Sequence, residues 1–348
     1  MDRHPLGLTQ LSQLCGCRVP MPILHQEKEF LDKVSVVIPL YNKAPYIARA
    51  LNSVLAQERL PEEIIVVDDG STDGGGEVVK QFQDPLIRLV RQENQGVSAA
   101  RNLGISLAKG ELIAFLDADD TWKPGFIETI VNMRQLYPQA GAYATAYEIV
   151  DPKGKKNNLE FRLLPSNCEQ GLIDNFFNKG KPQPLWTSAV VIPKDVFHKI
   201  GYFAEGEYLA EDIDMWIRIG ICYPVAWNRT VLAEYRQDAT HRVYGVRTFF
   251  HEPTFSVTVN KAIQSRIVPI EKMQDLREYA AYWQYWAVRQ LILNGEKKLA
   301  LKIIGQTRGT KIFQREGWIL AILAFLPPFF LKLAIIIYRF FHKIKYIL

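Results

Sequence analysis

Short, continuous runs of apolar and β-branched residues alternate with segments of helical periodicity between residues 34 and 116. An uninterrupted apolar run is typical of a strand that is buried on both faces, whereas apolar residues three and four apart indicate a helix. The predicted strands cover residues 34–39, 63–67, 86–90 and 112–116, and the predicted helices between them cover 44–57 and 97–108. This alternation predicts strands joined by crossover helices.

Strands joined in this way form an α/β fold. We therefore predict an open, mostly parallel, doubly wound sheet with flanking helices, followed by a C-terminal helical appendage. A sheet of this kind binds its ligand beyond the carboxyl ends of its strands.

Beyond residue 120 the pattern is less regular. The predicted elements there are a helix near 124–136, a strand near 142–150, a hairpin or acceptor-side excursion at 151–158, a strand at 188–192 and a helix at 211–221. Within the last helix, Asp214 and Arg218 are four residues apart and fit a surface ion pair.

Four segments follow from these patterns. They are a flexible N-terminal tail at 1–32, an α/β domain at 33–235, a helical appendage at 236–310 and an apolar, membrane-associating segment at 311–348.

The apolar segment contains fourteen uncharged residues from Trp318 to Leu331, interrupted by Pro327 and Pro328, and it ends in a basic stretch. Fourteen residues are fewer than the roughly 20 that cross a bilayer, and the two prolines break a helix. The pattern favours a two-part helix lying at a membrane surface, with its basic end toward anionic lipid. A kinked membrane span and a helix packed on the enzyme itself are the alternatives.

Composition narrows the possible partners and compartment. The net charge is +5, from 42 basic and 37 acidic residues, which is too small to indicate a nucleic-acid partner. The four cysteines lack metal-ligand spacing, and the N-terminus carries no signal-peptide pattern. We therefore expect a cytoplasmic protein attached peripherally to the inner face of the cell membrane.

Acidic residues follow two of the predicted strands, namely Asp68 and Asp69 after one strand and Asp117, Asp119 and Asp120 after another. A carboxylate at the end of a buried strand needs donors or a polar ligand, because an unpaired desolvated charge is costly. The Asp-Ala-Asp triplet can hold a hard divalent ion that also grips diphosphate oxygens. This arrangement suits a reaction in which a nucleoside diphosphate leaves.

Four segments in order resemble the family 2 glycosyltransferases, which have the nucleotide-sugar transferase fold of type A (GT-A). They read VSVVIPLYN at 34–42, IIVVDDGSTD at 64–73, GVSAARN at 96–102 and FLDADD at 115–120. The resemblance is close over 34–122 and looser to about residue 220. It implies that 33–235 is a GT-A catalytic domain, in which 33–122 binds the nucleotide-sugar donor and 123–235 forms the acceptor side.

This resemblance implies roles for individual residues. It implies donor binding by Pro39, Tyr41, Asn42, Asp69, Arg101 and Asp117, with Asp69 accepting a hydrogen bond from the base or ribose; the sequence itself lets Asp68 serve the turn while Asp69 remains free, and it leaves Arg101 either a phosphate ligand or a buried counter-ion of the aspartate cluster. It also implies that Asp119, together with Asp117, holds Mg²⁺ or Mn²⁺.

A general base is needed to remove the proton of the acceptor hydroxyl. The segment that begins with Glu211 and Asp212 resembles the Glu-Asp segment of the family, so Asp212 is the first candidate and Glu211 the second. An alternative is that both acids only favour the positive end of a helix.

Together, these features predict an inverting glycosyltransferase. It is expected to move a sugar from a nucleotide diphosphate donor, with a UDP-sugar the first to test, to a hydroxyl acceptor on a glycan or lipid-linked molecule in cell-surface polysaccharide, lipopolysaccharide or glycolipid synthesis. A non-catalytic binding or scaffold relative is the alternative. A dinucleotide-binding oxidoreductase is disfavoured, because the turn after the first strand lacks the required glycines.

Overall fold

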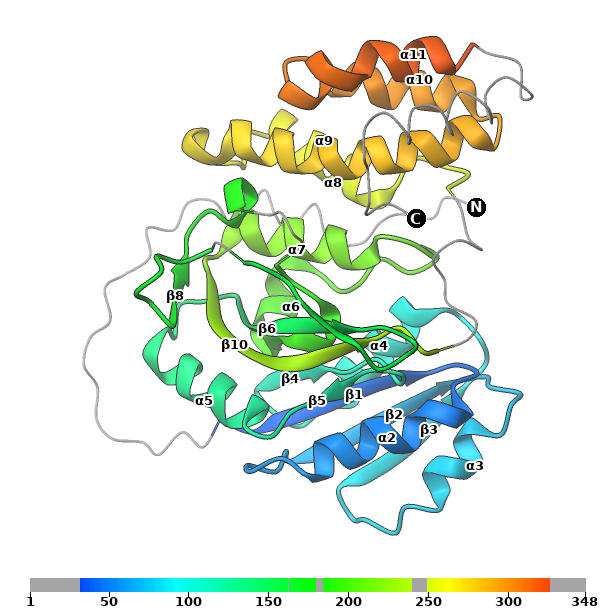
Figure 1. The fold of residues 1–348 in the computed structure, drawn as a ribbon, viewed down its shortest axis with the longest axis vertical. Helices are drawn as coiled ribbons and strands as arrows, with labels where there is room; N and C mark the ends of the chain where they lie inside the picture. Colours follow the sequence, from blue (N-terminus) through cyan, green and yellow to red (C-terminus); the bar gives the residue numbers. More distant parts are fainter. Residues whose placement is uncertain (1–31, 162, 180–183, 240–248, 326–348) are drawn as a thin grey trace. The chain divides into compact units, whose positions relative to one another are not determined.

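The computed structural model describes residues 32–161, 163–179, 184–239 and 249–325 (Figure 1). The predicted tail at 1–32 and the end of the apolar segment therefore lie almost entirely outside the described residues. The chain divides into two compact units. One contains the residues up to Gly206 and those from Arg218 to the end of the sheet, and the other contains Glu207–Ile217 and the C-terminal helices.

The sheet of the first unit begins with four parallel strands in the order β3-β2-β1-β4. Their bounds are β1 Val34–Leu40, β2 Glu63–Asp69, β3 Ile87–Gln92 and β4 Leu112–Phe115. Every residue of β2 and β4 is buried. These strands match the continuous apolar runs of the sequence, and the predicted α/β class is confirmed.

Helices cover both faces of this parallel part (Figure 1). Helix α4 (Val97–Leu107) packs on β1 and β2, while α2 (Ala44–Leu55) and α3 (Gly75–Lys80) lie on the other face. Gly104 of α4 lies so close to β1 that a Cβ added there would meet Val37 Cγ1 at 2.3 Å. A glycine is therefore required for this close helix–strand approach.

The rest of the sheet is mixed. Its strands are β5 Thr121–Trp122, β6 Ala142–Val150, β7 Lys156–Asn158, β8 Gln170–Ile173, β9 Val190–Pro193 and β10 Val225–Arg236. Strand β9 runs antiparallel between β4 and β6, and β10 pairs parallel with β6 through two register shifts. The predicted hairpin after residue 150 is confirmed, because β7 pairs antiparallel with β6.

Three further helices complete the region before the C-terminal helices. They are α5 Phe126–Leu136, α6 Lys194–Ile200 and α7 Glu211–Cys222. The predicted surface pair on α7 is wrong, because Asp214 and Arg218 are both buried. Asp214 accepts a hydrogen bond from Thr258 at 2.6 Å. The Arg218 guanidinium donates to the backbone carbonyls of the last residue of α6 and of the two residues after it.

The second unit is helical. Its elements are α8 Thr254–Gln264, α9 Ile270–Leu293, α10 Lys297–Gln306, a π-helical turn at Phe313–Gly317 and α11 Trp318–Leu323. Their apolar core gathers around Tyr285 and Leu291 of α9, Ile303 of α10 and Leu320 of α11. Among the described residues, no helix has the length and apolar character needed to cross a membrane.

Candidate functional site

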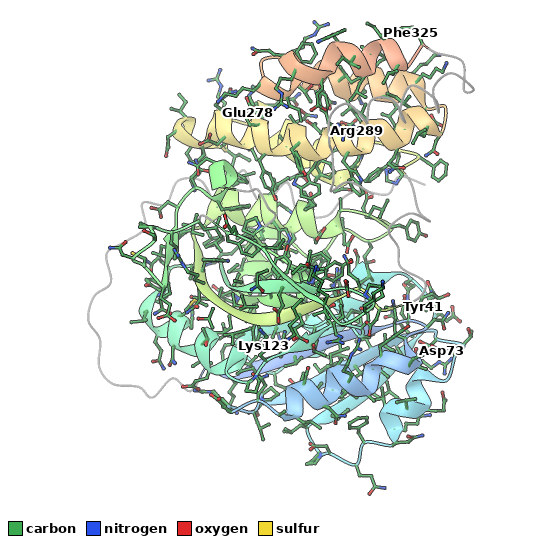
Figure 2. All side chains as sticks on the ribbon, in the orientation of Figure 1. Tyr41, Asp73, Lys123, Glu278, Arg289 and Phe325 are labelled. Carbon is green, nitrogen blue, oxygen red and sulfur yellow. The ribbon has the colours of Figure 1, made fainter. Side chains whose placement is uncertain are left out.

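The carboxyl ends of β1, β2 and β4 open on one edge of the sheet, as the sequence predicted. Strand β1 lies between β2 and β4 and is parallel to both. The segments after these strands therefore meet at this edge, and Figure 2 shows Tyr41 and Asp73 together there. This is the edge at which open α/β sheets bind ligands.

The loop after β1 is fixed by Asn42. Its backbone is left-handed, with a φ of 51°, a conformation that asparagine tolerates better than most residues. Its backbone N–H donates to Ser71 Oγ at 3.1 Å, and its side-chain oxygen accepts from the Thr72 N–H at 2.8 Å. Tyr41 is 43% exposed beside it, so an aromatic face is available at this edge.

Two neighbouring acids end β2, and both are buried. Asp68 accepts from the Ser71 N–H at 2.8 Å, so it serves the turn as predicted. Asp69 is not free, contrary to the prediction, because its two oxygens accept from Gln92 Nε2 and from the Gln95 and Gly96 N–H groups at 2.7–2.9 Å. Asp69 therefore shapes the loop before α4, and its contact with the nucleoside stays a prediction.

Arg101 on α4 forms an ion pair with Asp117. Its Nη2 lies 3.0 Å from Asp117 Oδ1, and its side chain is only 4% exposed. The guanidinium carbon lies 5.3 Å from the centroid of the Phe203 ring, and the Asp117 N–H donates to Ser188 Oγ at 3.1 Å. These contacts hold both members of the pair in place.

Asp119 forms an ion pair that the sequence did not predict. Lys43 Nζ, at the start of α2, lies 2.6 Å from Asp119 Oδ2. The backbone carbonyl of Asp119 also accepts from Arg49 Nη2 at 3.0 Å, and Asp238 pairs with Arg49 Nη1 at 2.6 Å. Lys43 before α2 and Arg49 within it thus position the predicted metal ligand.

Asp120 is the buried anchor of this acidic loop. Its carboxylate accepts from Ser188 Oγ at 2.6 Å, from Trp186 Nε1 at 3.0 Å and from the Arg236 N–H at 3.0 Å. Burial, followed by the nearby charges of Asp119 and Asp117, raises the pKa of Asp120 well above its ordinary value. Because its partners lie 66 to 116 residues away in the sequence, no local motif indicates this role.

The two candidates for the general base begin α7. Glu211 and Asp212 are half-buried in its first turn, and they belong to the second compact unit. Ala210, directly before them, has a φ of 62°, which a residue with a side chain adopts at a cost of about 1 kcal/mol. Strain of this kind is common at functional sites, and it fixes the direction in which the two acids enter the helix.

The chemistry of the donors at the strand edge fits a hard divalent ion. Asp117 pairs through Oδ1 and Asp119 through Oδ2 with a cation of the protein, and their side chains are 26% and 19% exposed. Carboxylate oxygens are the ligands that Mg²⁺ and Mn²⁺ prefer. Within the described residues, no group of three or more His, Cys, Asp or Glu side chains is arranged to hold a metal.

The parallel sheet with acids at its carboxyl edge and the mixed second half fit the GT-A fold that the sequence predicted. The family model of Glycosyl transferase family 2 matches residues 35–196. An uncharacterized glycosyltransferase of Nostoc sp. is 49% identical over 293 residues, which cover 82% of this chain and 84% of that protein. The chain belongs to glycosyl transferase family 2.

Two further proteins are similar to the chain. The glycosyltransferase GlyA of Streptococcus pneumoniae is 31% identical over 179 residues, half of this chain and a quarter of that protein. The structure of Staphylococcus aureus TarS 1-349 in complex with UDP-GlcNAc aligns with a TM-score of 0.65 at 16% identity, covering 84% of this chain and 89% of that one. At this identity the likeness establishes the GT-A fold.

Proposed function

We propose that this glycosyltransferase moves a sugar from a UDP-sugar to a hydroxyl acceptor with inversion at the anomeric carbon. The observation that carries the proposal is the Asp117-Ala118-Asp119 loop, which follows β4 at the carboxyl edge of the sheet. The parallel strands β1 and β2 bring Tyr41 and Asp69 to the same edge of the sheet. The UDP-GlcNAc bound to TarS supports a uridine nucleotide as the first donor to test.

The donor side divides between contacts for the nucleoside and for the diphosphate. Tyr41 offers an exposed ring for the base, and the hydrogen bonds of Asn42 hold the loop that carries it. Asp117 and Asp119 would hold Mg²⁺ or Mn²⁺, which supplies Lewis-acid stabilisation of the departing diphosphate. Arg101 orients the Asp117 carboxylate through their ion pair.

The acceptor side needs one carboxylate that removes the proton of the attacking hydroxyl. We assign this step to Asp212, with Glu211 as the alternative. In this proposal, a single displacement with attack opposite the leaving diphosphate gives inversion. Family membership, rather than a contact in the structure, supports this assignment.

The metal and base assignments are separated by Asp119→Asn and Asp212→Asn. The first variant should weaken Mn²⁺-dependent UDP binding by at least about tenfold, because it removes a ligand charge. The second should keep UDP affinity within about twofold and lower turnover by about 10²- to 10⁴-fold. Calorimetry and a UDP-release assay measure the two effects. Unchanged UDP affinity in Asp119→Asn would refute the metal assignment.

We also propose peripheral attachment to a membrane through α11. Its buried side places Leu320, Leu323 and Ala324 in the helical core. Its other side exposes Trp318, Ile322 and Phe325 by 58%, 56% and 72%. Figure 2 shows Phe325 at the end of this helix.

These three exposed residues are four and three positions apart and so share one side of a helix. Lys311 and Arg315, also exposed, precede them. A tryptophan with aliphatic and basic neighbours is typical of a helix that lies on an anionic lipid surface. The alternative of a helix packed on the enzyme itself fits the buried side of α11. Residues 326–348 lie outside the described part.

A further inference from the structure

The acids of the Asp-Ala-Asp loop each face a cation of the protein itself. Asp117 is paired with Arg101 at 3.0 Å and Asp119 with Lys43 at 2.6 Å. All four side chains are at most 26% exposed. The two carboxylates are therefore neutralised before any metal ion arrives.

A divalent ion that binds Asp117 and Asp119 meets two carboxylates that each already face a cation. Adding a charge of +2 to a balanced group in a poorly solvated place is unfavourable unless a cation leaves. Binding of the metal to Asp119 therefore competes with the ion pair that Asp119 already forms.

Lys43 is better able to leave than Arg101. The Arg101 side chain is 4% exposed, and its guanidinium lies against the Phe203 ring. Lys43 also lies near a ring, with Nζ 5.8 Å from the centroid of Tyr46, but it is 16% exposed, and a lysine is a point charge on a flexible four-carbon chain. It also precedes α2 directly, in the loop that Asn42 and Asp73 hold in place.

We propose that Lys43 is a resident counter-ion of Asp119 that the divalent metal displaces and that then contacts the donor diphosphate. Without donor, the ammonium holds the Asp119 carboxylate and keeps the loop neutral. With metal and donor bound, the two negative phosphates restore the charge balance, and the released ammonium can donate to their oxygens. The proposal rests on the metal-dependent donor site proposed above.

The role predicts opposite effects of one substitution on two affinities. In Lys43→Met, Mn²⁺ alone should bind about three- to tenfold more tightly, because its competitor is gone. UDP in saturating Mn²⁺ should bind about tenfold more weakly, because a charged donor to phosphate is lost. Both constants are measured by calorimetry on the full chain.

Two controls show whether the effect belongs to this lysine. Lys33→Met removes an exposed lysine that pairs with Glu62 at 3.0 Å in the same unit, and both affinities should stay within about twofold of wild type. Lys43→Arg retains the cation and should not tighten Mn²⁺ binding. A circular dichroism melt shows whether Lys43→Met is folded.

The possible outcomes distinguish the counter-ion role of Lys43 from the proposed function. Opposite shifts in Lys43→Met support the counter-ion role. Shifts in the same direction, or none, in a folded variant overturn it while wild-type binding of UDP with Mn²⁺ still supports the proposed function. Absence of UDP binding by the wild type overturns the proposed function and this role with it.

Discussion

Glu234 on β10 accepts hydrogen bonds from three side chains, those of Lys156, Thr121 and Arg236. Burial acts to raise the pKa of Glu234, but these hydrogen bonds and the charge of Lys156 lower it to about 2. A carboxyl whose pKa in the folded protein is below its unfolded value of 4.5 stabilises the protein at pH values above 4.5. This stability is lost as the pH falls from about 4.5 toward 2.

We therefore expect Glu234→Gln to lower the free energy of unfolding by about 1–2 kcal/mol at pH 7, a figure reduced for solvent screening. The difference from wild type should shrink between pH 5 and pH 2.5. Urea unfolding at several pH values measures this. Glu62→Gln, at an exposed ion pair, is the control and should change stability by less than about 0.5 kcal/mol. A pH-independent difference for Glu234→Gln would contradict the account.

For single residues, the sequence predicted which acids lie at the same edge of the sheet, but not all of the side chains that each acid contacts. The positions of Asp69, Asp117 and Asp119 followed from acids placed after buried strands. Arg101, 16 residues from its partner Asp117, was expected as a ligand or a buried counter-ion, but Lys43, 76 residues from its partner Asp119, was not predicted. No local sequence pattern identifies a lysine after a strand as the partner of an acid that is distant in the sequence.

Among the elements, α4 depends on close contact with β1. A Cβ at Gly104 would meet Val37 Cγ1 at 2.3 Å, so Gly104→Ala forces the helix and strand apart. We expect a loss of about 1–3 kcal/mol in the free energy of unfolding. Because α4 carries Arg101, the affinity for UDP should fall as well.

Gly305 provides the matched control. It lies in α10, it is exposed, and an added Cβ would have no heavy atom within 4 Å. Gly305→Ala should leave stability unchanged or raise it by up to about 1 kcal/mol, since alanine favours a helix. Denaturant unfolding distinguishes the two variants. Equal effects would show that the α4–β1 contact is not as tight as described.

The parallel strands could be predicted because each is an uninterrupted apolar run with a crossover helix beside it. Strand β9 was expected near its observed position, but its antiparallel place between β4 and β6 was not. Strand β10 was missed as a strand. Its register shifts near Val231 interrupt the regular pattern that periodicity can recognise.

For the whole molecule, the proposed membrane attachment is tested on the exposed side of α11. Truncation after Gly317 would also remove Leu320 and Leu323, which belong to the helical core. The triple variant Trp318→Ser, Ile322→Ser, Phe325→Ser leaves that core intact. This variant should cosediment with anionic phospholipid vesicles at least about fivefold less, because it lacks the three exposed apolar side chains that would enter the lipid surface.

A matched control removes exposed apolar residues elsewhere. Leu60 and Leu136 are 54% and 58% exposed in the first unit. The variant Leu60→Ser, Leu136→Ser should bind vesicles as wild type does. If the α11 variant also sediments as wild type does, this face does not attach the protein to lipid.

The central claim is that the strand edge carrying Asp117 and Asp119 is a metal-dependent site for a nucleoside diphosphate donor. The most direct test is calorimetric titration of the full chain with UDP, and with the other nucleoside diphosphates, in the presence and absence of Mn²⁺. The account predicts micromolar binding of UDP that weakens at least about tenfold when Mn²⁺ is removed by a chelator. Absence of binding by every nucleoside diphosphate, with or without Mn²⁺, would contradict it and favour a non-catalytic scaffold.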